Sequence, residues 1–146
     1  MSNVEKLLDG KGTEIWQVSP DDTVIEAIRL MEDKSIGALA VLLNEELVGI
    51  VSERDYARKV VLKGRSSSDT KVKDIMSRQV FYVTQENTVD HCMVLMTEKR
   101  IRHLPVMKND KMIGMISLGD VVKSIINDQE YKIKQLENYI SWEESY

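Results

Sequence analysis

Two short segments of the sequence each place a serine three residues before an aspartate, directly after an apolar run that begins at a glycine. They are GIVSERD, residues 49–55, and GMISLGD, residues 114–120. A serine at a strand-to-helix turn can cap the helix, and the aspartate can accept a bond from the serine backbone. The same carboxylate can instead accept bonds from two neighbouring hydroxyls, such as those of a ribose. Helix capping and sugar binding are therefore both open for each pair.

The position of these pairs at the start of a helix adds a second property. Unpaired backbone N–H groups and partial positive charge at a helix N-terminus attract anions such as phosphate. Gly49 and Gly114 lack a side chain, so a ligand could approach each strand closely, and we expect them to line a pocket. The combination fits a nucleoside phosphate.

The two segments belong to a duplication that covers most of the chain. Shifted by 65 residues, the sequence matches itself without a gap from about residue 15 to residue 62, and thirteen pairs between positions 18 and 55 are identical. Each copy reads as strand, helix, two strands and helix. One such unit buries too little apolar surface to be stable alone. We therefore predict an α/β (α+β) fold of two β-α-β-β-α repeats packed about a pseudo-two-fold axis.

Hydrophobic periodicity and turn residues divide the chain into segments. In the first copy we expect a helix at 23–34, a hairpin of strands at 38–43 and 47–51, and a helix at 52–64. A tail with Ile133, Leu136 and Ile140 on one face is predicted to be a packing helix. The predicted boundaries are an N-terminal segment at 1–11, repeat 1 at 12–64, a linker at 65–74, repeat 2 at 75–127 and a C-terminal helix at 128–146.

Composition narrows the classes of function. The chain has 146 residues, 42% hydrophobic and 30% charged, with a net charge of −4. This balance argues against a nucleic-acid partner. No apolar stretch reaches the ~18 residues of a membrane span, and no apolar signal core stands at the N-terminus. Cys92 is the single cysteine and cannot form an internal disulfide. Together, the missing span, the missing signal core and the single cysteine lead us to expect a cytoplasmic protein without a membrane partner.

The sequence resembles the tandem cystathionine-β-synthase (CBS) domain pairs, also called Bateman modules, over residues 12–127. The resemblance rests on the duplication, on Gly-h-h-Ser-x-x-Asp in both copies, on VKDIMS before the second copy and on RIRHLPV within it. It implies that an adenosyl ligand (AMP, ADP, ATP, NAD or S-adenosylmethionine) binds in a cleft between the repeats. By position, it implies that four residues hold the ribose: Ser52, Asp55, Ser117 and Asp120.

The two copies differ in their basic residues. The first copy carries Arg54 and Arg58 in its second helix, whereas the second carries Arg102 and His103 in its strand. Because family pairs face their repeats across one cleft, we infer that these four groups converge on a phosphate, a task that suits arginine. A solvated helix face for the arginines and a core position for His103 are the alternatives. Pro105 is expected at a strand edge or beside the ligand.

These observations favour a regulatory module that senses an adenine nucleotide and passes its occupancy to an unidentified protein. AMP is the first candidate, with NAD or ATP next, and no metal is expected. The alternative is a ligand-independent scaffold with vestigial sites. An enzyme is disfavoured, because the repeats occupy nearly all of the chain and no P-loop or base–nucleophile set is visible. Family pairs associate through their helices, so a homodimer is expected.

Overall fold

The computed structural model describes residues 2–144 and has the mixed α+β fold that the sequence predicts. It divides into two compact units. The first-repeat unit comprises residues 14–82 and 107–113, and the second-repeat unit comprises residues 2–13, 83–106 and 114–144. The arrangement about a pseudo-two-fold axis stays a prediction.

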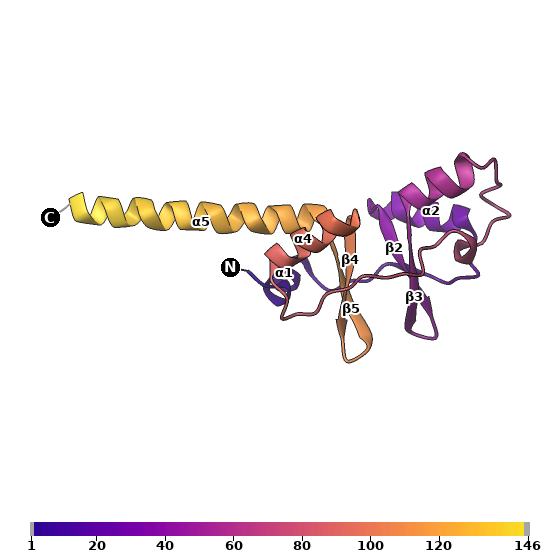
Figure 1. Cartoon of the computed structure of the whole chain (residues 1–146), viewed down its shortest axis with the longest axis horizontal. Coiled ribbons are helices and arrows are strands. Elements are labelled where there is room, and N and C mark those ends of the chain that lie inside the picture. The colour runs from indigo at the N-terminus through magenta and orange to yellow at the C-terminus, as the bar shows by residue number, and fades with distance from the viewer. Residues whose placement is uncertain (1, 145–146) are drawn as a thin grey trace. The chain divides into compact units, whose positions relative to one another are not determined.

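The first-repeat unit contains a three-stranded sheet with strand order β1-β2-β3 (Figure 1). β1 runs parallel to β2, and β2 runs antiparallel to β3. Apolar side chains of α2, β2 and β3 form its buried core. The elements are β1 (Gln17–Val18), α2 (Val24–Lys34), β2 (Ala38–Leu43), β3 (Glu46–Ser52), α3 (Glu53–Tyr56), a π-helical turn (Ala57–Val61) and a 3-10 turn (Val72–Asp74).

The second helix of the first repeat differs from the prediction of a single helix over 52–64. α3 is one turn long, and the chain continues as a π-helical turn in which the Leu62 N–H donates to the Ala57 carbonyl at 3.0 Å. Gly64 then has a φ of 66°, a conformation that glycine adopts without a steric penalty. The apolar pattern of the sequence does not separate a helix with i→i+4 bonds from one with an i→i+5 turn.

The second repeat has the same order of helix, hairpin and helix. Together with α1 it forms the second-repeat unit, except for the tip of the hairpin, residues 107–113, which belongs to the first-repeat unit. The β4–β5 pair forms a two-stranded sheet, and Val83 pairs in parallel with Val106. Asn109 and Asp110, between the strands, both have positive φ (50° and 65°), as a two-residue hairpin turn requires. The elements are α1 (Val4–Lys11), α4 (Val89–Lys99), β4 (His103–Lys108), β5 (Lys111–Ser117) and α5 (Leu118–Glu144).

The N-terminal segment, to which the sequence analysis gave no structure, forms α1 and completes the second-repeat unit. The Asn3 side chain caps α1 by accepting from the Lys6 N–H. The Val4 N–H donates to the Asn87 carbonyl at 2.9 Å, and Val4 and Leu8 are buried. A segment that precedes the first repeat in the sequence therefore supplies core residues to the unit that contains the second.

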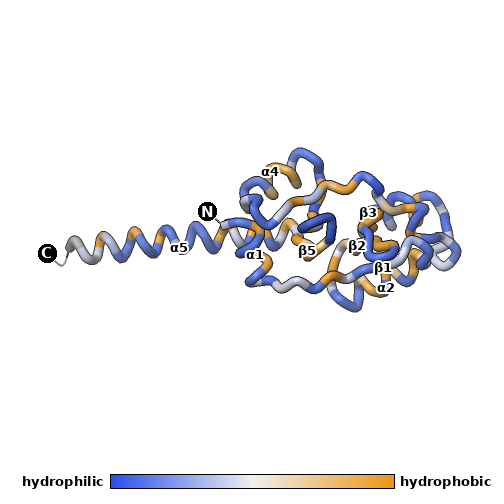
Figure 2. The backbone as a smooth tube through the Cα atoms, turned by 90° about the horizontal axis from the view of Figure 1, so that it is seen from below, coloured by the Kyte–Doolittle hydropathy of each residue, from blue (hydrophilic) through white to orange (hydrophobic). Residues whose placement is uncertain are grey.

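The predicted C-terminal helix is confirmed as far as Glu144, and positions 145–146 lie outside the described residues. The helix is one piece with the second helix of the second repeat. α5 runs for 27 residues through position 128 without a break. The Ser2 hydroxyl donates to Asp128 Oδ1 at 2.8 Å, which ties the middle of α5 to the N-terminal segment. From Gln129 to Trp142 every residue is exposed, and polar and apolar residues alternate along this part of the helix (Figure 2).

The two motif glycines face protein atoms. A Cβ added at Gly49 would lie 2.7 Å from Met76 Sδ and 2.9 Å from the Ser77 carbonyl oxygen. Ser77 is fixed there because its backbone exchanges two hydrogen bonds with Ile50. A Cβ at Gly114 would lie 2.9 Å from Leu8 Cδ2, at the end of a flexible side chain. The proposed role of the glycines in lining a ligand pocket stays a prediction.

We predict that Gly49→Ala destabilises the protein by about 1–3 kcal/mol, because the new methyl group must displace backbone atoms. Gly114→Ala is the matched control, and its cost should be smaller because the Leu8 side chain can move aside. Urea unfolding of both variants measures the difference. Equal costs at the two glycines would contradict this account of the packing.

Candidate functional site

The first Ser-x-x-Asp segment forms a complete capping box at the start of α3. The Asp55 N–H donates to the Ser52 hydroxyl at 3.2 Å, and the Ser52 N–H donates to Asp55 Oδ2 at 2.9 Å. The Ser52 hydroxyl also lies 3.1 Å from the same carboxylate oxygen. The capping alternative is therefore confirmed for this pair, and it fixes the carboxylate at the mouth of the turn.

The second segment reproduces this geometry at the start of α5. The Asp120 N–H donates to the Ser117 hydroxyl at 3.1 Å, and the Ser117 N–H donates to Asp120 Oδ2 at 2.8 Å. The next residue, Leu118, donates its N–H to the Arg102 carbonyl at 2.8 Å, as Glu53 donates to Gly37 in the first copy. The duplication seen in the sequence thus extends to individual hydrogen bonds.

Each motif carboxylate also contacts a lysine that the sequence analysis did not single out. Lys59 Nζ lies 3.1 Å from Asp55 Oδ1 and donates to the Ile75 carbonyl at 2.8 Å. Lys59 is four residues beyond Asp55 on the same helical segment, so helix periodicity could have revealed this pair. Its presence beside the carboxylate adds a cation to the candidate site of the first repeat.

In the second repeat the corresponding cation comes from α1. Lys11 Nζ lies 2.5 Å from Asp120 Oδ2 and donates to the Met115 carbonyl at 2.6 Å. The two partners are 109 positions apart in the sequence. No local pattern could have predicted the pair, because it depends on how α1 packs on the second-repeat unit.

These contacts set the charge of Asp120. Burial by itself would raise the pKa of this carboxyl, but the hydrogen bond from Lys11 and those from Ser117 hold the pKa below its ordinary value. Asp120 is therefore ionised at neutral pH and can act only as an acceptor. Such a group can bind hydroxyls or a cation.

Three of the predicted site residues line one pocket in the second-repeat unit. His103 is the first residue of β4, Arg102 directly precedes it, and Ser117 ends β5, around an open pocket of about 570 Å³. Its other wall is the first two turns of α5, where Lys123 adds a further cation. Lys11, Lys123 and Asp120 line a neighbouring pocket of about 550 Å³ between α1 and α5. Lys123 thus lines both pockets.

His103 is a neutral histidine in this setting. Burial lowers its pKa below the ordinary value of 6.5, the positive charges of Lys11 and Arg102 lower it further, and Asp120 opposes them. A neutral imidazole offers one donor and one acceptor, whereas the protonated ring offers two donors. An anion bound beside the ring would favour the protonated form.

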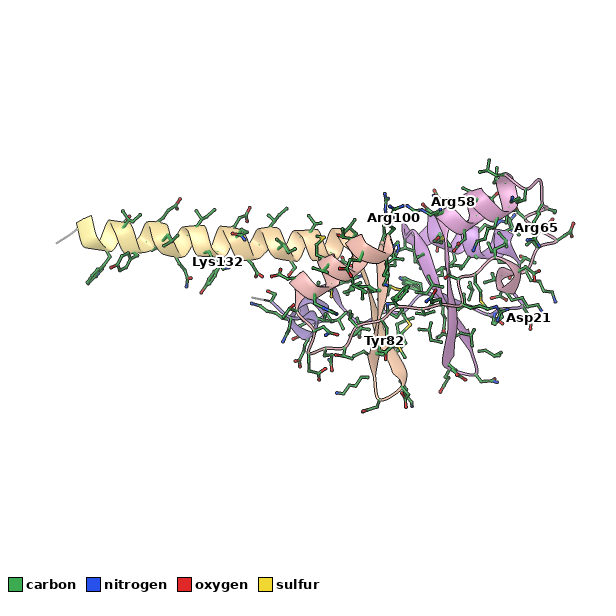
Figure 3. The ribbon with its side chains drawn as sticks, viewed as in Figure 1. Asp21, Arg58, Arg65, Tyr82, Arg100 and Lys132 are labelled. Atoms are coloured by element: carbon green, nitrogen blue, oxygen red, sulfur yellow. The ribbon has the colours of Figure 1, made fainter. Side chains whose placement is uncertain are left out.

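The remaining predicted residues lie on the turn after β3 and inside β4. Arg54 is on α3 and is exposed. Arg58 is on the π-helical turn and is also exposed (Figure 3). Pro105 is buried in β4, where its carbonyl accepts from the Val83 N–H at 3.0 Å. The convergence of the arginines with Arg102 and His103 involves both units and stays a prediction, as does the place of Pro105 in a pocket.

The comparison with known families identifies the class of protein. The sequence matches the CBS domain at residues 13–62 and again at residues 72–127. Together with the duplicated capping turns and the two α+β units, this shows that the chain belongs to the CBS domain family and carries two copies of the domain.

Individual relatives support the same conclusion. The chain is 44% identical over 134 residues to the mitochondrial CBS domain-containing protein CBSX3 of Arabidopsis thaliana, covering 88% of this chain and 65% of that protein. A solved CBS-domain protein from Burkholderia ambifaria is 50% identical, with a TM-score of 0.85, and the match covers 88% of this chain and 96% of that one. The CBS domain pair of protein MJ0100 shares the fold at 20% identity, with a TM-score of 0.78 and coverage of 88% and 98%.

The described part of the chain bears on the expected absence of a membrane partner and of a metal. Among residues 2–144, none of the helices combines the length and the apolar character that crossing a membrane requires. Nor do three or more His, Cys, Asp or Glu side chains in this range form a group able to hold a metal ion. A site without metal stays a prediction.

We predict that Lys11→Met raises the pKa of Asp120, because the strongest interaction that stabilises its ionised form is removed while the apolar stem is kept. An NMR titration of the carboxyl carbon measures the change. Lys6→Met is the matched control, since Lys6 also lines the pocket between α1 and α5 but does not bond to Asp120. An unchanged pKa of Asp120 in Lys11→Met would show that this ion pair does not form in solution.

We also predict a pH dependence of stability from His103. Its pKa is lower in the folded protein than in the unfolded chain, so the unfolded state binds more protons and the free energy of unfolding falls as pH drops below about 6.5. His103→Gln should flatten this slope in urea unfolding between pH 7 and pH 5. His91→Gln, at an exposed position of α4, is the matched control for the loss of an imidazole. A slope that survives in His103→Gln would rule out His103 as its source.

Proposed function

We propose that this chain is a regulatory module that binds an adenine nucleotide between its CBS repeats and transmits the occupancy to another protein. The observation that carries the proposal is the pair of serine–aspartate turns, each holding an ionised or ion-paired carboxylate at the start of a helix. The structure of the MJ0100 domain pair is a complex with 5′-methylthioadenosine and S-adenosylmethionine, and this supports an adenosine ligand for the fold.

The carboxylates suit a ribose because they accept hydrogen bonds and carry no donor. The bonds that Asp120 accepts from the Ser117 N–H and from Lys11 Nζ both end on its Oδ2 atom. The capping bond that Asp55 accepts from the Ser52 N–H likewise ends on Oδ2. A diol that approaches from the Oδ1 side could bind Asp120 without breaking the cap. We propose this role for Asp55 and Asp120, with Ser52 and Ser117 beside the sugar.

The cations around the second site favour a ligand with phosphate groups. Arg102 and Lys123 line the same pocket as Ser117, and Lys11 lies on Asp120. Such a field attracts phosphate and disfavours the cationic sulfonium of S-adenosylmethionine. We therefore place AMP first, with NAD or ATP next, and propose that Arg54, Arg58, Arg102 and His103 serve the phosphates.

The same proposal covers the oligomeric state, the absence of catalysis, the partners and the location. We propose a homodimer that has no catalytic activity of its own, regulates an unidentified protein and binds neither nucleic acid nor membrane. The chain spans 65% of the length of the Arabidopsis relative, and that relative is named as mitochondrial, so a cytoplasmic location stays a prediction. Signal transmission would follow from a ligand that binds one conformation more tightly than another.

A thermal-shift series with AMP, ADP, ATP, NAD and S-adenosylmethionine tests the proposal. With ligand at 100 times its Kd, mass action stabilises the folded state by ~2.7 kcal/mol, which is a readily measured rise in Tm. We expect the largest rise with a phosphate-bearing nucleotide. No shift with any of them at millimolar concentration would favour the scaffold function, in which the capped and lysine-paired carboxylates are purely structural.

Two substitutions show which of the two aspartates binds the nucleotide. Asp55→Asn and Asp120→Asn keep a side-chain oxygen for the cap but remove the charge and one of the two acceptors. We expect the variant of the occupied site to lose the shift and the other to keep it. A 2′,3′-dideoxy nucleotide should bind weakly, and equal binding of this analogue would contradict the ribose role.

A further inference from the structure

The distal part of α5 has an apolar face that is exposed. Every residue from Gln129 to Trp142 is exposed, and α5 continues well past α1 and α4 in both views (Figures 1 and 2). At ~1.5 Å per residue the whole helix is about 40 Å long. Isolated helices of ~12–15 residues are marginal in water, and most helices are stabilised by burying an apolar face. The exposed apolar residues of this segment therefore need an explanation.

The exposed aliphatic residues of α5 follow a heptad repeat, which we call the α5 seam. Ile126, Ile133 and Ile140 recur every seven residues, and each is about half exposed (50%, 54% and 54%). Val122, Gln129 and Leu136 each stand four residues before one of these isoleucines in the sequence. This spacing keeps all six side chains on one stripe, with isoleucine at every a position and valine, glutamine and leucine at d.

The residue types of the α5 seam specify its occupant. β-branched residues at a positions favour two-stranded parallel coiled coils when leucine occupies d, as Leu136 does in this seam. Gln129, at another d position, is the one polar residue among the six. A seam with these features is complementary to itself, so a second copy of the same helix fits it.

The charges beside the seam indicate whether the two helices run parallel or antiparallel. Lys132 stands at a g position, and Glu130 and Glu137 stand at e positions; the Lys132 side chain projects from the exposed part of α5 (Figure 3). In a parallel pair, a g residue faces the e residue five positions later in the other chain. Lys132 would then face Glu137 of the second copy, twice over by symmetry. An antiparallel pair would instead set glutamate against glutamate.

We propose that α5 pairs with α5 of a second copy as a parallel two-stranded coiled coil over residues 122–140. The two second-repeat units then lie at the same end of the coiled coil. The contact does not require a nucleotide, but Val122 and Ile126 at its start also line the pocket of Arg102, His103 and Ser117. It is distinct from any dimer made by other helices of the domains.

Cysteine cross-linking in the full chain tests the proposal. In a parallel pair, Gln129→Cys places two thiols opposite each other at a d position, and mild oxidation should link the chains. Asn138→Cys is the matched control, because position 138 is on the opposite side of the helix and should not link. The native Cys92 does not interfere, since it is buried and burial raises its pKa to about 11.

Exchange of the charges at positions 132 and 137 provides a second test, carried out in the Gln129→Cys background. Lys132→Glu and Glu137→Lys should each abolish the Gln129→Cys link, because each sets like charges across the seam. Mixing the two variants should restore it, since every g–e′ pair is again of opposite sign. Absence of the Gln129→Cys link in the otherwise native chain, equal linking at positions 129 and 138, or no recovery on mixing would overturn the proposal. A dimeric mass without the 129 link would show that the copies associate through another surface.

Discussion

The hydrogen-bonded turn between the last strand and the last helix of each repeat is the constraint on which the rest of the site depends. In both copies the serine hydroxyl accepts from the aspartate N–H, and the aspartate accepts from the serine N–H. A cap of this kind contributes about 1 kcal/mol. Its larger consequence is geometric, because it holds a carboxylate in a fixed orientation beside the first turn of a helix. Capping and ligand binding are therefore compatible roles for the same side chain.

The two repeats supply different surroundings to the same turn. Asp55 is paired with Lys59 of its own helical segment, whereas Asp120 is paired with Lys11 of α1. α1 also places Leu8 over Gly114, so the N-terminal helix is part of both the core and the candidate site of the second-repeat unit. A ligand at Asp120 would meet a carboxylate whose charge is already balanced by a residue from a separate element. The two sites should consequently differ in affinity.

α5 connects the site to the surface of the molecule. Its first turn carries Asp120, its residues between 118 and 126 line the pocket of Arg102 and His103, and the α5 seam runs along it from Val122 to Ile140. A continuous helix is a stiff element, so displacement of its first turn is carried to the distal end. This continuity gives a physical route by which occupancy of a site could alter contacts between copies.

Much of the fold was determined by the sequence alone, because the signals are local. The hairpin strands, the caps at Ser52 and Ser117 and the duplication follow from residue types at fixed short spacings, which dictate local hydrogen bonding. The tertiary structure alone decided that Lys11 pairs with Asp120, that Leu8 lies against Gly114, and that burial keeps His103 neutral. These features join residues far apart in the chain, and their partners are selected by packing rather than by any periodic pattern. The same holds for the space beside the motif glycines, which a sequence shows only as a missing side chain.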